Sequence, residues 1–134
     1  MEKLNIKAAT DRLDDVIAFV VRQLEEADCP MKAQMQIELA VEEIFVNIAH
    51  YAYKPKEGMA DITVDIRDGA AYITFEDGGV PYDPLAKADP DITLSADDRA
   101  VGGLGIFMVK KSMDDMKYEY RDSKNILTLV KKLR

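Results

Sequence analysis

The sequence predicts an α/β two-layer sandwich, in which one mixed, mostly antiparallel sheet of about five strands lies under three helices. Helical hydrophobic spacing in three segments and apolar-polar alternation in five others predict the two layers. Hairpin signals at Asp68-Gly69 and at Asp122-Ser123-Lys124-Asn125 require antiparallel neighbours. The chain of 134 residues is long enough to bury one core without disulfides, so a single domain over residues 1–134 is expected.

Three segments have the apolar spacing of amphipathic helices. They are residues 12–27, 31–53 and 103–114. Thr10 or Asp11 can cap the first helix, and Pro30 suits the first turn of the second. The three helices are expected to cover one face of the sheet, which leaves the other face exposed or available to a partner or a second copy of the chain.

Five segments alternate between apolar and polar residues, as half-buried strands do. They are residues 3–8, 59–67, 71–75, 116–121 and 125–132. The two hairpin signals join the second strand to the third and the fourth to the fifth. The alternation therefore predicts one sheet with a buried face and an open face.

Composition excludes several classes of function. A net charge of −7 argues against general binding of nucleic acids or of anionic membranes. The single cysteine, Cys29, rules out an internal disulfide, and no Cys/His cluster indicates zinc. There is no apolar run long enough for a signal peptide or a membrane span. We therefore expect a cytoplasmic protein.

The second predicted helix carries a carboxylate and an amide four residues apart. Glu43 and Asn47 stand one above the other on one stripe, beside the apolar arc. Such a pair can hold a metal ion and a reacting oxygen together. The same spacing is typical of a solvated Glu–Asn pair on an amphipathic helix, so the rest of the chain has to decide between the two interpretations.

An acidic residue followed by glycines stands at the end of the third strand. A buried Asp77 there can accept a hydrogen bond from an exocyclic amine, and Gly79 can let a flat base approach the backbone. Asp-Gly-Gly is also common turn chemistry. Both interpretations remain open from these residues alone.

A long segment without periodicity, at about residues 82–101, precedes the last helix. Loops of this length are often functional lids, although an acidic surface loop has the same composition. Gly102-Gly103-Leu104-Gly105 then opens the helix, where free backbone N–H groups can face an anion. No Gly-Lys-Ser/Thr follows, and no strand precedes, so this glycine motif is neither the Walker nor the Rossmann type.

Three motifs in a fixed order resemble a known superfamily. Glu43-x-x-x-Asn47, Asp77-x-Gly79 and Gly103-x-Gly105 look like the three boxes of the GHKL ATPases, whose nucleotide site is called the Bergerat fold. The resemblance spans nearly the whole chain. Within the superfamily, the chain most resembles the bacterial anti-sigma factor serine kinases, which bind a sigma factor and phosphorylate an anti-anti-sigma (STAS-type) partner on serine.

The resemblance implies ATP and Mg²⁺ as cofactors and assigns roles to residues of the first two boxes. Glu43 would be the catalytic base that orients the attacking hydroxyl. Asn47 would bind Mg²⁺ through its amide oxygen. Asp77 would accept a hydrogen bond from the adenine amino group, with Gly79 beneath the ring.

The resemblance also assigns the phosphate site. The residues of the glycine motif would present backbone groups to the phosphates: Gly102, Gly103, Leu104 and Gly105. The segment at about residues 82–101 would close as a lid, and Arg99, its only arginine, is the candidate for a phosphate contact. Lys110 and Lys111 are weaker candidates, because lysines two turns into a helix usually face solvent.

The chain departs from the family pattern at two positions. Pro81 stands where many members have a second glycine, and Tyr51 stands where many close members have a histidine. His50 is therefore assigned a packing or helix-end role and no catalytic one. Glu42 points about a hundred degrees away from Glu43 around the helix, which indicates a solvated side chain.

Two classes of function fit this pattern. The first is an ATP-dependent serine kinase that also acts as an anti-sigma factor. The second is an ATP-binding regulatory module that changes conformation without phosphoryl transfer. A plain interaction domain with inactive motifs is a third class, and the intact order of the three boxes argues against it.

Overall fold

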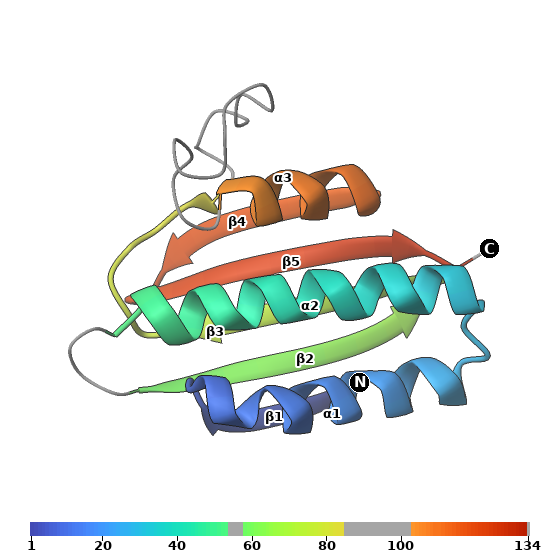
Figure 1. The fold of residues 1–134 in the computed structure, drawn as a ribbon, viewed down its shortest axis with the longest axis horizontal. Coiled ribbons are helices and arrows are strands. Elements are labelled where there is room, and N and C mark those ends of the chain that lie inside the picture. Colours follow the sequence, from blue (N-terminus) through green and yellow to red (C-terminus); the bar gives the residue numbers. More distant parts are fainter. Residues whose placement is uncertain (54–57, 85–102, 134) are drawn as a thin grey trace.

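The protein forms two layers, a sheet and a layer of helices (Figure 1). The computed structural model describes residues 1–53, 58–84 and 103–133. The strands are β1 (Glu2–Lys7), β2 (Met59–Arg67), β3 (Ala70–Asp77), β4 (Asp115–Arg121) and β5 (Lys124–Lys132). They form one sheet in the order β1-β2-β3-β5-β4. All four pairings are antiparallel, so the predicted two-layer fold is confirmed with a sheet that is antiparallel rather than mixed.

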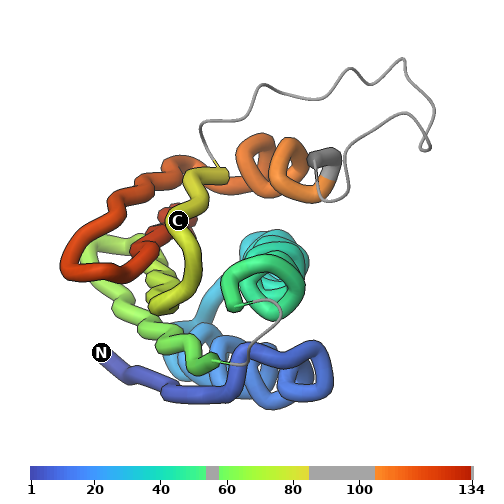
Figure 2. The backbone as a smooth tube through the Cα atoms, turned by 90° about the vertical axis from the view of Figure 1, so that its left-hand side faces the viewer, coloured from blue at the N-terminus to red at the C-terminus, as the bar shows by residue number. Residues whose placement is uncertain are grey.

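The helices lie together on one face of the sheet, as predicted (Figures 1 and 2). They are α1 (Leu13–Glu26), α2 (Met31–Tyr51) and α3 (Gly103–Ser112), and each ends one or two residues before its predicted end. The central helix α2 contacts both α1 and α3. Within the described residues, none of the helices is long and apolar enough to span a membrane.

The start of α1 and the position of Pro30 differ from the prediction, whereas α2 begins at Met31 as predicted. Residues Thr10–Arg12 form a 3₁₀ turn, so neither Thr10 nor Asp11 caps α1 through its side chain, and α1 begins at Leu13. Pro30 precedes the first turn of α2, because its ψ of 143° is extended. The Pro30 carbonyl accepts a hydrogen bond from the Gln34 amide at 2.9 Å, which starts the helix without a side-chain cap.

Both hairpin turns contain two residues with positive φ. Asp68 and Gly69 have φ of 53° and 75°, and Asp122 and Ser123 have φ of 54° and 63°. Two successive left-handed residues match the twist of antiparallel strands. The second turn is therefore shorter than the four residues predicted, and Asn125 lies within β5, opposite Asp77 of β3.

The hydrophobic core lies between the sheet and the helices, and α2 supplies its centre. Its largest fully buried side chains come from both layers: Val16, Val20, Leu24, Ile37, Val41, Phe45, Ile62, Ile73, Phe75 and Leu129. Burying each such side chain contributes about 1.5–3 kcal/mol. The core therefore fixes how α2 lies over β3 and β5.

The open face of the sheet carries polar side chains that bond across strands. Asn5 donates to Asp61 at 2.7 Å, and the hydroxyl groups of Thr74 and Thr128 lie 3.2 Å apart. The suggestion that this face binds a partner or a second copy stays a prediction.

The chain that leaves β3 packs against the C-terminal end of α2. The Val80 amide donates to the Ala52 carbonyl at 2.9 Å. The Gly78 amide donates to the Tyr53 hydroxyl, which in turn donates to the Met59 carbonyl, both at 2.6 Å. A Cβ on Gly79 would overlap the backbone of Ala52. The close approach of these two segments therefore requires glycine at position 79.

We predict that Gly79→Ala destabilises the fold and that Gly78→Ala, its matched control, does so far less. The methyl group at position 79 must push the backbone of Ala52 away, whereas at position 78 it meets only the Tyr53 hydroxyl at 3.6 Å. Overpacking of this kind costs about 1–3 kcal/mol. Urea denaturation of the two variants measures the difference, and equal midpoints would contradict the packing argument.

Candidate functional site

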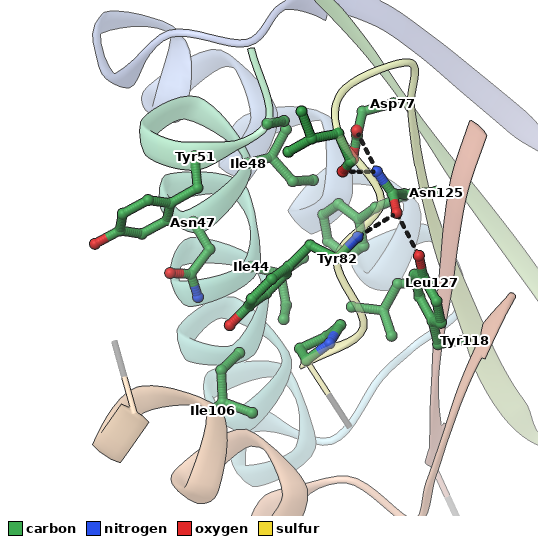
Figure 3. Close-up of a pocket in the computed structure, with 14 residues that line it drawn as sticks. Ile44, Asn47, Ile48, Tyr51, Asp77, Tyr82, Ile106, Tyr118, Asn125 and Leu127 are labelled. Atoms are coloured by element: carbon green, nitrogen blue, oxygen red, sulfur yellow. Dashed lines mark hydrogen bonds between the residues drawn. The ribbon is translucent and has the colours of Figure 1, made fainter. Parts of the chain in front are cut away.

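A pocket of about 500 Å³, counting its open mouth, lies between α2, the start of α3 and the ends of β3 and β5 (Figure 3). Among the described residues, the amide and carboxylate side chains that line it are Asn47, Asp77 and Asn125. Most of the remaining wall is apolar or aromatic and comes from Ile44, Ile48, Tyr51, Ala52, Phe75, Val80, Tyr82, Pro84, Ile106, Tyr118 and Leu127. A mostly apolar cavity with a few polar groups is typical of a small-molecule site.

Asp77, the last residue of β3, is the carboxylate of this pocket and is only 6% exposed. Its Oδ1 accepts hydrogen bonds from the Gly79 amide and from Asn125 Nδ2, both at 3.0 Å. Neither bond uses Oδ2. A carboxylate fixed through one oxygen can accept a hydrogen bond from a ligand through the other.

Asn125 is a site residue that the sequence analysis did not identify. Its Nδ2 donates to Asp77 and to the Val80 carbonyl at 2.8 Å, while its Oδ1 accepts from the Tyr82 amide at 3.0 Å and from the Tyr118 hydroxyl (Figure 3). These four bonds use the full hydrogen-bonding capacity of an asparagine side chain. Asn125 shares the buried face of β5 with Leu127 and Leu129. A polar residue in that alternation was the signal that could have revealed it.

Asn47 lines the same pocket from α2 (Figure 3). Its Nδ2 is buried and has no hydrogen-bond partner among the residues that the structure describes. An unpartnered buried polar atom costs about 1–3 kcal/mol. A ligand that supplies polar atoms beside Asn47 would therefore be favoured.

A divalent metal at this place would depend on the ligand as well as the protein. In the described parts of the chain, no group of three or more His, Cys, Asp or Glu side chains could hold a metal ion. Mg²⁺ commonly takes one or two protein oxygens and completes its shell with phosphate oxygens and water. The Asn47 side chain borders the pocket, so its amide oxygen can supply one such ligand, while its unpartnered Nδ2 is a donor that suits an acceptor such as a phosphate oxygen.

Glu43 lies one helical turn before Asn47 and contacts the start of α3. A Cβ on Gly105 would overlap the Glu43 carboxyl group, so glycine at this position lets the carboxylate lie against α3. Burial raises the pKa of Glu43, and the neighbouring Glu42 raises it further. Glu43 is not among the described residues that line the pocket. The structure thus brings Glu43 next to Gly105 rather than into the cavity.

The glycine motif opens α3 as predicted, because the helix begins at Gly103. Backbone N–H groups in the first turn of a helix have no partner within the helix, and the dipole favours an anion there. Ile106, in the same turn, borders the pocket. Gly103, Leu104 and Gly105 can therefore present N–H groups near the cavity. Gly102, Arg99 and most of the predicted lid lie outside the described residues, so their roles remain predictions.

The other residues that the sequence analysis weighed lie at the rim or beyond it. His50 is exposed and makes an edge contact with Tyr51, with ring centroids 6.0 Å apart, while Tyr51 lines the pocket. Glu42 and Pro81 are exposed. Lys111 places its Nζ 5.3 Å from the centre of the Phe107 ring.

Comparisons with known proteins find a matching family and several similar proteins. Residues 6–131 match the family model described as the histidine kinase-like ATPase domain. The chain is 29% identical over 100 residues to the serine/threonine-protein kinase BtrW of Bordetella bronchiseptica, covering 73% of this chain and 70% of that protein. It is 26% identical over 107 residues to the anti-sigma F factor of Clostridium acetobutylicum, covering 80% of this chain and 75% of that one.

Solved structures share the fold. One is the structure of the RsbU and RsbW domains of a Mycobacterium tuberculosis protein. The alignment covers 99% of this chain and 33% of that protein's chain, with a TM-score of 0.65 and 15% sequence identity. That likeness concerns the fold alone. The family match is broader evidence, because it spans all three described helices and the sheet except for most of β1 and the last residue of β5. The chain therefore belongs to the histidine kinase-like ATPase family, of the GHKL type.

Proposed function

We propose that this chain is a cytoplasmic ATP-dependent serine-protein kinase that also acts as an anti-sigma factor. It would capture a sigma factor and phosphorylate a STAS-type anti-anti-sigma protein on serine. The observation that carries the proposal is one pocket lined by both Asp77 and Asn47, with Glu43 one helical turn from Asn47. The names of the relatives, a serine/threonine-protein kinase and an anti-sigma factor, support the same function.

The base of the nucleotide would bind at Asp77. The carboxylate is a hydrogen-bond acceptor, which matches the exocyclic amine of adenine and opposes the carbonyl oxygen that guanine has at the same position. The apolar and aromatic wall, with Phe75 and Tyr82, provides surface for a flat ring. Together these features favour an adenine nucleotide.

The phosphates would lie between Asn47 and the start of α3. The backbone N–H groups of Gly103, Leu104 and Gly105 would donate to phosphate oxygens. The Asn47 amide oxygen would hold Mg²⁺, which when bound neutralises phosphate charge. This compensation matters in a chain whose net charge is −7.

Glu43 would act on the attacking hydroxyl group. The oxygen of the partner serine forms the new bond to the γ-phosphorus, the bond from that phosphorus to the bridging oxygen of ADP breaks, and the serine proton passes to the Glu43 carboxylate. The raised pKa of Glu43 makes its carboxylate a better proton acceptor than an exposed glutamate.

The conformational-switch function is the second candidate, and one observation favours it. Glu43 lies against Gly105 and is not among the described residues that line the pocket. If a nucleotide binds beside α3 without contacting Glu43, it would change the conformation of the protein, and no phosphoryl group would be transferred. The Glu43 variant below separates these two functions.

We predict that Asn47→Ala weakens binding of MgATP but changes binding of metal-free ATP much less. Loss of a residue that supports a metal site costs about 10–100-fold in affinity. Calorimetry with Mg²⁺ and with EDTA measures both affinities. Gln36→Ala is the matched control, because Gln36 lies three turns earlier on the same side of α2 and does not line the pocket. Equal losses with and without Mg²⁺ would show that Asn47 only supports the helix.

We predict that Glu43→Gln keeps MgATP affinity and lowers phosphoryl transfer to the partner by about 10²–10⁴, the range for losing a positioned base. Transfer is measured with radiolabelled ATP, Mg²⁺ and candidate STAS-type proteins, with Glu38→Gln as the control on the same helix. Sigma-factor binding should survive, because capture does not require the chemistry. A wild-type chain that binds ATP and transfers nothing would favour the switch. Undiminished transfer in Glu43→Gln would assign the base elsewhere.

We predict a pH-dependent rate whose acidic limb reports Glu43. The base must be ionised, so transfer rises as pH rises through the Glu43 pKa, which lies above its ordinary value of 4.5. Glu42→Gln removes the second cause of that shift, so the limb should move to lower pH, while Glu38→Gln should leave it in place. If the acidic limb of the pH–rate profile stays at the same pH in Glu42→Gln, a group other than Glu43 causes it.

A further inference from the structure

We propose that Asn125 is a positioning residue that fixes Asp77 for recognition of the adenine amino group and shapes the adjoining wall of the pocket. This proposal rests on the proposed function, because it needs an adenine nucleotide in the pocket. In this proposal Asn125 does not contact the reacting atoms of the substrate. It acts through Asp77 and through the chain that follows Asp77.

The side chain of Asn125 joins three segments that are distant in sequence (Figure 3). It bonds to Asp77 at the end of β3, to Val80 and Tyr82 in the chain beyond β3, and to Tyr118 of β4. It is 6% exposed, so these bonds are shielded from water. A buried amide with four partners has one orientation, because turning it by 180° would place donors against donors.

The first consequence concerns the orientation of the carboxylate. Asp77 Oδ1 receives two donors, the Gly79 amide and Asn125 Nδ2, each at 3.0 Å. The Gly79 bond comes from the neighbouring backbone and moves with it. The Asn125 bond comes from another strand and therefore ties the carboxylate to the sheet. With both donors on Oδ1, Oδ2 is the oxygen available to the ligand.

The second consequence concerns the wall beside the base. The Val80 carbonyl and the Tyr82 amide bond to the two ends of the same amide group, at 2.8 and 3.0 Å. The side chains of Val80 and Tyr82 both line the pocket. Asn125 therefore sets the acceptor and the adjoining wall at once. Removing it should affect recognition of the amine more than binding of the phosphates.

The test compares ATP with purine riboside triphosphate, which lacks only the exocyclic amine. Wild-type protein should bind ATP about 10–100-fold more tightly than this analogue, the range for a hydrogen bond to a charged acceptor. Asp77→Ala removes the acceptor, so this variant should bind the two ligands with equal affinity and gives the lower limit of the preference. Asn125→Ala should reduce the preference to about threefold or less. Asn5→Ala is the matched control, because Asn5 donates to Asp61 on the open face of the sheet and should leave the preference intact.

The ratio of the two affinities separates positioning from structural support. If Asn125 only supported the fold, Asn125→Ala would weaken both ligands equally and keep the wild-type ratio, which would overturn the proposal. If the melting curve shows that Asn125→Ala is unfolded at the assay temperature, Asn125→Leu replaces it. That variant fills the space of the side chain and loses the donor to Asp77, so the preference should fall as well.

The result also distinguishes this proposal from the proposed function. A wild-type protein that binds no adenine nucleotide would contradict the proposed function itself. A wild-type protein that prefers ATP, with the preference unchanged in Asn125→Ala and Asn125→Leu, would leave the proposed function standing and overturn the role of Asn125.

Discussion

The hydrogen bond between Asp77 and Asn125 depends on the register of β3 and β5, and it joins two side chains that line the pocket. In this register the two residues are direct neighbours across the strands, and both side chains face the helices. A slip of one residue would turn Asn125 to the open face and leave Asp77 buried with one donor fewer. The two-residue turn at Asp122 and Ser123 joins β4 to β5, so it brings Tyr118 beside Asn125 as well.

Local sequence patterns were sufficient for most of the fold. Hydrophobic spacing predicted all three helices, and alternation predicted all five strands, because both patterns follow directly from burial on one side. The same spacing placed the start of the last helix at residue 103, where α3 begins, and the burial that adenine recognition by Asp77 requires is present, because Asp77 is 6% exposed. Errors concerned ends, such as the 3₁₀ turn before α1, where weak capping preferences competed with tertiary contacts.

Contacts between distant segments were beyond such patterns. Asn125 was placed where the turn meets the last strand, with no role in the site, and its partners belong to β3, to the segment that follows β3 and to β4. Gly79 was predicted to admit a flat base, whereas its lack of a side chain is already required by the backbone of Ala52. The contact between Glu43 of α2 and Gly105 of α3 joins two residues that lie 62 positions apart in the sequence. None of these pairs has a local signature, because each depends on how the layers pack.

The two ends of the pocket differ in how far their polar groups are satisfied. At one end, Asp77 and Asn125 are bonded to protein groups and need little rearrangement when a ligand binds. At the other, Asn47 has a buried nitrogen without a partner in the described chain, and burial raises the pKa of Glu43. Unmet polar groups cost stability in the empty protein, and a ligand that satisfies them recovers that cost as binding free energy. The end that we propose binds the base is therefore already organised by protein hydrogen bonds, while the end near α3 has polar groups that a ligand can still satisfy.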